Sequence, residues 1–127
     1  MIKKKDTRKI ATGKEGEKIA ADFLKKNGYR IAEVNYRCPI GEIDIVARDK
    51  NELVFVEVKA RKSSAMGYPE QAVGVKKQKK MSQLVLWYLQ EKKLNDVHAR
   101  FDVVAVLMLP QGNDIRLIQN AFDFIAL

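Results

Sequence analysis

The sequence predicts an α/β domain in which helices flank a mixed central β-sheet. Two observations support this prediction. Apolar residues recur at helical spacing in two stretches and alternate with polar residues in several shorter ones, and the order along the chain is helix, three strands, helix, two strands. A length of 127 residues and a hydrophobic content of 46% suit a single domain with one core.

The first elements follow from local signals near the amino terminus. Residues 1–12 lack periodicity and are predicted to be a basic, flexible arm that precedes a single domain over residues 13–127. The first helix is expected from about Lys14 to Asn27, because Gly28 suits the positive φ needed after a helix. The first strand is expected from Tyr29 to Tyr36.

The next two strands are predicted to form a hairpin. Gly41–Ala47 and Leu53–Lys59 both alternate polar and apolar residues, and Asp49–Glu52 between them has the composition of a four-residue loop. The second strand is apolar on both faces, which is typical of a sheet covered on both sides.

This hairpin would bring two acids together. If the loop pairs Arg48 with Leu53, antiparallel counting places Asp44 opposite Glu57, with their Cβ atoms about 5 Å apart. Lys59 lies on the same face, because side chains in a strand repeat every second residue. Two such carboxylates repel unless a cation, a proton or a basic partner lies between them. A hard cation such as magnesium would suit them, and so would a structural triad in which Lys59 neutralises both acids.

The second half of the chain supplies a helix and two strands. Arg61–Pro69 is expected to be a polar loop near the acid pair, and the second helix to begin between Pro69 and Val75 and reach about Gln90. The last strands are expected over Arg100–Met108 and Ile115–Gln119, with Asp102 in a structural role, bonded to Arg100 or to a backbone amide.

The charge of the chain favours a nucleic-acid partner. Lys and Arg number 24 against 16 Asp and Glu, which gives a net charge of +8. A basic protein without such a partner is the simpler alternative, but the cations are clustered. The candidate nucleic-acid contacts are an amino-terminal cluster, a pair after the hairpin and a block in the second helix: Lys3, Lys4, Lys5, Arg8, Lys9, Arg61, Lys62, Lys76, Lys77, Lys79 and Lys80.

Several classes of protein are disfavoured. No apolar run approaches the ~20 residues of a membrane span, and the basic start is followed by no apolar segment typical of a secretory signal. The single cysteine, Cys38, excludes an intramolecular disulfide and a zinc site built from thiolates. We therefore expect a cytoplasmic protein with no membrane partner and no small-molecule cofactor.

The chain resembles the YraN-like family of predicted endonucleases, within the PD-(D/E)xK nuclease superfamily and related to archaeal Holliday-junction resolvases. The superfamily pattern is an Asp on one strand followed by Glu-x-Lys on the next, as in Asp44, Glu57 and Lys59. Five ordered blocks carry the resemblance: Gly13–Ala20, Gly28–Ile31, Asn35–Ala47, Val54–Arg61 and Arg100–Val106.

This resemblance implies a restriction-endonuclease-like core and a role for each matching residue. Asp44 and Glu57 match the metal-binding acids, Lys59 matches the catalytic lysine, and Glu17 matches an acid on the first helix that completes the site in resolvase-like members. From geometry alone, Glu17 could equally pair with a neighbouring lysine of its own helix. Ile43 stands where the superfamily name implies a proline, at a position that varies in the superfamily.

The resemblance implies a Mg²⁺-dependent endonuclease, with Mn²⁺ as an alternative ion. The carbonyl of Val58 is a candidate further ligand beside Asp44, Glu57 and Glu17. DNA is the expected substrate, in particular a branched structure such as a Holliday junction. Resolvase-like enzymes act as dimers, so a homodimer is the expected assembly.

Two other functions fit parts of the sequence. The chain could be a non-catalytic nucleic-acid-binding module that keeps the nuclease fold and assists a recombination or repair partner. It could also be a basic RNA- or ribosome-associated domain, which explains the charge but not the acid pair. Binding of divalent ions at Asp44 and Glu57 discriminates, because a binding module does not require it.

Overall fold

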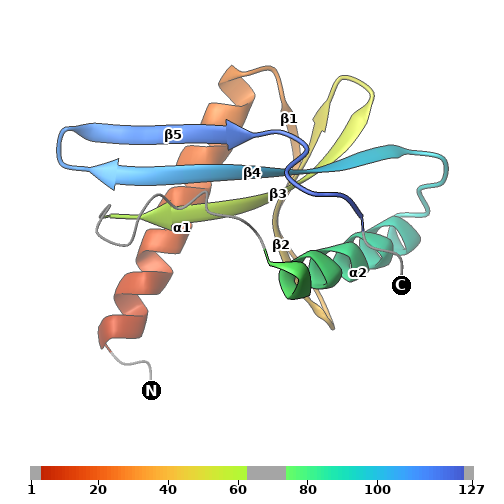
Figure 1. Cartoon of the computed structure of the whole chain (residues 1–127), viewed down its shortest axis with the longest axis horizontal. Coiled ribbons are helices and arrows are strands. Elements are labelled where there is room, and N and C mark those ends of the chain that lie inside the picture. Colours follow the sequence, from red (N-terminus) through yellow and green to blue (C-terminus); the bar gives the residue numbers. More distant parts are fainter. Residues whose placement is uncertain (1–3, 63–73, 125–127) are drawn as a thin grey trace.

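The structure is a computed structural model that describes residues 4–62 and 74–124, with side chains described from residue 12 onward. The predicted order of helix, three strands, helix and two strands is confirmed (Figure 1). The elements are α1 (Lys4–Lys26), β1 (Arg30–Cys38), β2 (Gly41–Asp49), β3 (Glu52–Arg61), α2 (Val75–Glu91), β4 (His98–Leu109) and β5 (Gly112–Ile118).

The five strands form one mixed sheet in the order β1-β2-β3-β4-β5. β3 and β4 run parallel, whereas the other three neighbouring pairs are antiparallel. A parallel pair needs a crossover connection, and α2 lies in the segment between β3 and β4. The predicted α/β class with a restriction-endonuclease-like core is therefore confirmed.

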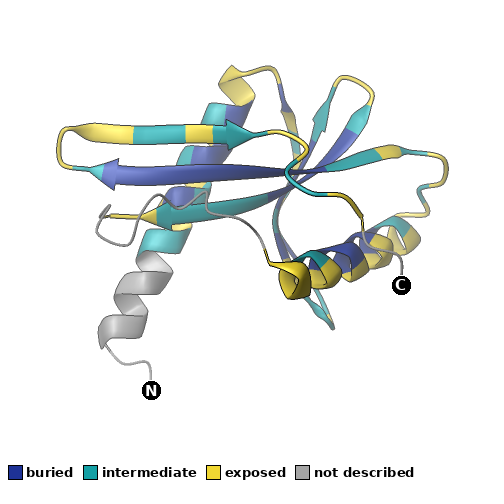
Figure 2. Ribbon diagram, viewed as in Figure 1, coloured by how far each residue is buried: buried dark blue, intermediate teal, exposed yellow. Residues whose placement is uncertain are grey.

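Each face of the sheet is covered by one helix. On one face, Leu24 of α1 packs with Val54 and Val56 of β3, and α1 crosses behind β3, β4 and β5 in Figure 1. On the other face, Phe55 packs with Met81 of α2. β4 is buried along most of its length (Figure 2). The predicted burial of β3 on both faces is thus confirmed. Successive residues of β3 pack alternately into the core under α1 and the core under α2.

The first helix begins earlier than predicted. α1 starts at Lys4, within the segment expected to be an arm, and not near Lys14. A helix does not end where its apolar stripe ends. Lys, Arg and Ala have favourable helix propensity, so a helix that packs on the sheet can continue beyond its packed turns toward the amino terminus. The predicted end is confirmed, because Gly28 has φ of 90° and the Tyr29 N–H bonds to the Leu24 carbonyl at 3.0 Å.

The β2–β3 hairpin has the predicted register but a shorter turn. Arg48 pairs with Leu53 as expected, and Asp49 also pairs with Glu52, which leaves only Lys50 and Asn51 in the turn. The predicted four-residue loop was therefore wrong. Lys50 adopts a φ of 56°, which is typical of tight two-residue hairpin turns.

Arg100 organises the edge of the sheet at the β2–β3 turn. Its guanidinium donates to Asp49 and Glu52 at 2.8 Å each and to Asp102 at 3.0 Å. Asp102 is fully buried and also accepts from the Tyr29 hydroxyl at 2.9 Å and from the backbone N–H of Asn120 at 3.0 Å. The structural role predicted for Asp102 is confirmed, with both expected kinds of partner present.

Within the described part of the chain, neither helix combines the length and apolar character that crossing a bilayer would require.

Candidate functional site

The regular pairing of β1 with β2 is interrupted at Asp44. The paired register contains Val34 with Ile45 and Tyr36 with Ile43, but not Asn35 with Asp44. Asn35 has a φ of 55°, in the left-handed region that asparagine tolerates better than most residues. The strands are therefore distorted at the level of Asp44.

The pairing of β2 with β3 also changes at this level. The ladder ends with Ile45 opposite Val56, one step before Asp44 would face Glu57. The Val58 N–H instead donates to Asp44 Oδ2 at 2.8 Å. The predicted direct pairing of Asp44 with Glu57 is therefore absent from the paired register, because the strand is distorted here and the Asp44 carboxylate accepts from a backbone amide.

Asp44 lies among other acids in a partly dehydrated environment. Burial and the charges of Glu57, Glu17 and Glu42 together raise the pKa of its carboxyl to about 7, against the lowering effect of the Val58 N–H. A raised pKa means that the surroundings of Asp44, taken together, disfavour its ionised form.

Glu17 reaches the same region from α1. A Cβ at Gly16 would collide with the Cβ of Ala60 on β3, so the buried glycine permits the close approach of helix and sheet that brings Glu17 over the strand ends. Burial raises the pKa of Glu17, while a hydrogen bond from the Asn35 side chain lowers it. Glu17 thus joins Asp44 electrostatically, and its interactions extend beyond its own helix.

Lys59 is half-buried on β3, two residues after Glu57, so the two side chains share the face that α2 covers. Arg61 and Lys62 follow at the exposed end of the strand. The Lys62 ammonium lies 3.7 Å from a carboxylate oxygen of Glu15 on α1. The Glu-x-Lys segment therefore leads from the acids toward an exposed basic end.

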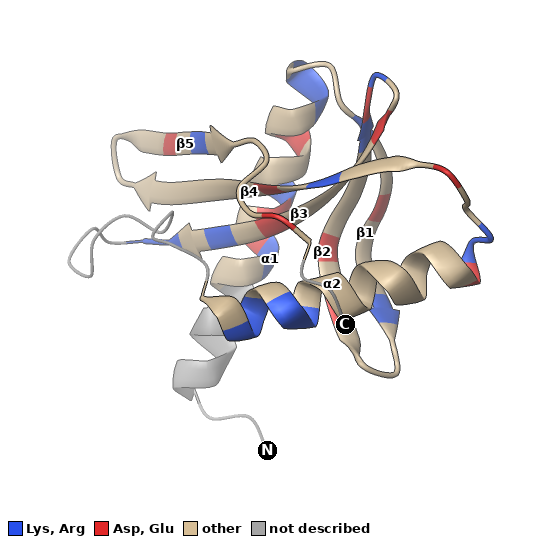
Figure 3. Ribbon diagram, turned by 45° about the vertical axis from the view of Figure 1, so that its right-hand side comes forward, with Lys and Arg blue, Asp and Glu red and all other residues tan. Residues whose placement is uncertain are grey.

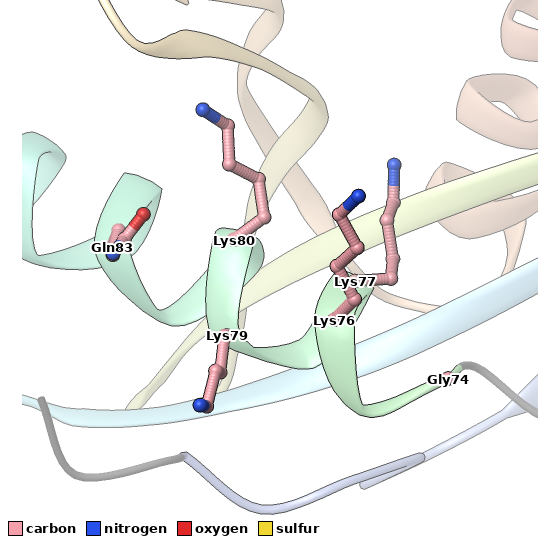
Figure 4. Close-up of a pocket in the computed structure, with 6 residues that line it drawn as sticks. All are labelled: Gly74, Lys76, Lys77, Lys79, Lys80 and Gln83. Carbon is pink, nitrogen blue, oxygen red and sulfur yellow. The ribbon is translucent and has the colours of Figure 1, made fainter.

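The lysine block of α2 lies beside the acids. Figure 3 shows the basic residues on the first turns of α2 and acidic residues on the neighbouring strands. The Lys77 Nζ lies 3.3 Å from Glu57 Oε1; the Lys77 side chain is 50% exposed and that of Glu57 only 16%. A surface hollow is lined by this block: Gly74, Lys76, Lys77, Lys79, Lys80 and Gln83 (Figure 4).

The donor set fits a hard divalent cation that retains several waters. Carboxylate oxygens of Asp44 and Glu57 and the carbonyl of Val58 are oxygen ligands of the kind that magnesium takes. Among the described residues, no three or more His, Cys, Asp or Glu side chains form a ready-made metal cage. An ion held at Asp44 and Glu57 would therefore have few protein ligands and would keep several of its waters.

Sequence reasoning missed two residues of this site and one contact. Asn35 bonds to Glu17 and Glu42 adds negative charge near Asp44, whereas Lys77, predicted as a nucleic-acid contact, also contacts Glu57. Asparagine is unusual inside a strand, so Asn35 was the one detectable signal of a distorted backbone. The other two roles depend on which elements pack together, and no local pattern encodes them.

Other predicted contacts lie outside the described residues. The side chains of Lys4, Lys5, Arg8 and Lys9 are not described, and neither is Lys3. The polar loop predicted over Arg61–Pro69 lies largely in residues 63–73, which are also not described. Lys76, Lys79 and Lys80 are exposed, as a nucleic-acid contact requires.

Comparison with known proteins identifies the family of the chain. The model of "Uncharacterised protein family UPF0102" matches residues 16–106, which include Glu17, Asp44, Glu57 and Lys59. A UPF0102 protein of Syntrophus aciditrophicus is 54% identical over 117 residues, which is 92% of each chain. A UPF0102 protein of Desulfosudis oleivorans is 50% identical over 113 residues, covering 87% of this chain and 89% of the relative.

A UPF0102 protein of Acetivibrio thermocellus is 48% identical over 120 residues, covering 90% of this chain and 92% of the relative. Similarity at this level extends over both helices and all five strands. The chain therefore belongs to the UPF0102 family, the YraN-like family that its sequence blocks resemble.

Proposed function

We propose that this protein is a metal-dependent endonuclease that hydrolyses DNA phosphodiester bonds. The observation that carries the proposal is the placement of Asp44, which is half-buried among like charges with its pKa raised to about 7 by burial and by Glu57, Glu17 and Glu42. Such an arrangement opposes folding when the acid is ionised, and a divalent cation removes the repulsion.

The chain would hold the cation through few of its own atoms. The Val58 N–H donates to Asp44 Oδ2, and the other carboxylate oxygen of Asp44 is the one that would bind the ion. The Val58 carbonyl and Glu17 are further candidate ligands. When bound, a magnesium or manganese ion would supply Lewis-acid activation of a water molecule and neutralise charge on the scissile phosphate.

Lys59 would act on the attacking water or on the phosphate. A half-buried lysine beside two acids can orient or deprotonate a water, and its ammonium form can stabilise the additional negative charge of the transition state. Its position on the same face as Glu57 supports either role. The lysines of α2 would meet neighbouring phosphates of the strand being cut.

DNA of branched structure is the proposed substrate, on the strength of the resemblance to junction resolvases. The lysine block offers point charges for phosphates, and phosphate contacts carry no base information. Recognition by shape therefore fits this surface better than recognition of sequence. A homodimer would allow two symmetric cuts in a four-way junction.

A non-catalytic nucleic-acid-binding module is the second candidate. The contact between Lys77 and Glu57 favours it, because this ammonium lies on one of the proposed metal ligands. In such a module the lysines would bind nucleic acid and the acids would remain without an ion. Binding of divalent cations separates the two proposals.

A cleavage assay tests the proposed activity. The native chain, Asp44→Ala and the control Asp22→Ala, an exposed acid of α1, would be incubated with labelled single-stranded, duplex, flap and four-way-junction DNA and with RNA. Each substrate would be tested with magnesium, manganese or chelator. We expect metal-dependent cutting by the native chain and by Asp22→Ala, and none by Asp44→Ala.

Two results would count against the nuclease. Equal cutting by Asp44→Ala and the native chain would show that the active site does not include Asp44. DNA binding without cutting by the native chain in either metal, together with no measurable binding of divalent cations, would support the non-catalytic module.

A further inference from the structure

Lys77 differs in its surroundings from the other lysines at the start of α2. Figure 4 shows the side chains of Lys76, Lys77 and Lys80 directed toward one side of α2 and that of Lys79 toward the other. Of these four, Lys77 has an ion pair with an acid of the candidate site, 3.3 Å from Glu57 Oε1. One ammonium therefore belongs to the basic block and to the acid cluster together.

The Lys77–Glu57 contact has the properties of an exchangeable ion pair. It consists of one contact from a half-exposed lysine on a flexible stem, and pairs of this kind contribute about 0–1 kcal/mol. The side chain of Arg100, in contrast, is 11% exposed, and its guanidinium contacts two acids at 2.8 Å each. Glu57 can thus change partners at little cost.

A divalent cation and the Lys77 ammonium would compete for Glu57. Both are positive, and a cation between Asp44 and Glu57 would repel an ammonium 3.3 Å from the same carboxylate. The displaced side chain would remain in the hollow with Lys76 and Lys80, where repulsion from like charges favours contact with an anion. A phosphate of a bound nucleic acid is the anion that the proposed function supplies.

We propose that Lys77 is an exchangeable counter-ion, which holds Glu57 before the cation binds and moves to a backbone phosphate when the cation takes its place. This inference rests on the proposed function. It makes the cation and the nucleic acid bind cooperatively, because each removes a competitor of the other. Coupling between two ligands is reciprocal, so either binding reaction can be used to measure it.

The test compares two lysine substitutions that change the net charge equally. Lys77→Met removes the contact with Glu57, whereas Lys79→Met removes a lysine of the same hollow that is directed the other way. Both positions are exposed on a helix, and thermal unfolding would check that each variant folds. Calcium binding would be measured by calorimetry at physiological salt, with and without a four-way-junction DNA.

We expect Lys77→Met to bind calcium about five-fold more tightly than the native chain in the absence of DNA. Lys79→Met should stay close to the native affinity. Adding DNA should tighten calcium binding about five-fold or more in the native chain and in Lys79→Met, and by much less in Lys77→Met. Cleavage is not needed for any of these measurements.

Equal calcium affinities in Lys77→Met and Lys79→Met would overturn the exchange, as would equal tightening by DNA in both. These results leave the proposed nuclease intact, provided that Asp44→Asn weakens calcium binding. If Asp44→Asn bound calcium as well as the native chain does, or if the native chain bound none with or without DNA, the metal site would fail and the exchange with it.

Discussion

The same sheet carries two groups of acids that are treated in opposite ways. Near the β2–β3 turn, Asp49, Glu52 and Asp102 surround one guanidinium, and each accepts a hydrogen bond from it. At the other end of the hairpin, burial and the charges of Glu57, Glu17 and Glu42 raise the pKa of Asp44 to about 7. The first group stabilises the fold, whereas the second opposes it and gains from binding something positive.

The two groups also differ in the cation that contacts them. Arg100 offers several donors in a rigid planar group, and its side chain is only 11% exposed. Lys77 offers a compact ammonium on a flexible stem, and half of its side chain is exposed. A cation held in place stabilises the fold, whereas a cation that can be displaced leaves its acid available to bind a ligand. The contrast is the physical basis for assigning function to the second group.

The largest expected effect comes from removing the fixed cation. Arg100→Met should lower the free energy of unfolding by roughly 3–5 kcal/mol, because it leaves the fully buried Asp102 without its charged partner. The control is Arg116→Met, which breaks an exposed pair 3.4 Å from Asp114 and should cost no more than about 1 kcal/mol. Urea unfolding would measure both, and equal losses would remove the distinction between the two groups.

Removing the charge of Asp44 should have the opposite sign. Asp44→Asn keeps an oxygen to accept the Val58 N–H and removes the repulsion with Glu57, so we expect it to stabilise the metal-free protein at pH 8 by roughly 1–3 kcal/mol. The same change should abolish cleavage and weaken binding of divalent cations.

The sign of the pH dependence follows from the raised pKa. Between about pH 4 and pH 7 the folded state keeps a proton on Asp44 that the unfolded state has lost, so this group's contribution to stability falls as the pH rises. The advantage of Asp44→Asn over the native chain should therefore grow from pH 5 to pH 8. Urea unfolding in chelator would measure it, and a constant or negative difference would contradict the raised pKa.

A smaller effect is expected on cation binding. Asp44 must lose its proton to bind a cation, so the affinity for manganese should fall by about ten-fold for each pH unit below 7 and level off above it. Calorimetry between pH 5.5 and pH 8.5 would measure the affinity. An affinity that does not change between pH 5.5 and pH 7 would place the ion away from Asp44.

The sequence predicts most of the fold because its signals are local or periodic. Alternation fixed the hairpin register that leads to Asp44 and Glu57, and Gly28 marked the end of α1. The predicted start of α1 was wrong, because the amino-terminal turns of this helix lack an apolar stripe but contain residues with good helix propensity. The predicted turn at Lys50 was longer than the observed one, because polar residues at the ends of strands have the same composition as a loop.

The site was predictable only in part, because some of its contacts join elements far apart in the chain. Asp44, Glu57 and Lys59 lie on one hairpin, so strand periodicity predicts that they are close in space, but it does not predict that the pairing ends before Asp44. Lys77 comes from a helix whose packing on the sheet no local pattern specifies. The role of Asn35 could not be predicted without knowing that its backbone leaves the strand conformation.

The smallest expected effect concerns Asn35, and it tests whether the distorted strand serves the acids or only the backbone. Asn35→Ala should cost about 1 kcal/mol, because alanine tolerates a φ of 55° less well than asparagine does. Asn35→Gly permits that φ and should cost less.

Both variants remove the hydrogen bond to Glu17, so both should bind manganese several-fold more weakly if this bond holds Glu17 in place. Unfolding and calorimetry would separate the two effects. Native manganese affinity in Asn35→Gly would confine the role of Asn35 to the backbone, whereas equal weakening in both variants would make Asn35 a positioning residue for Glu17.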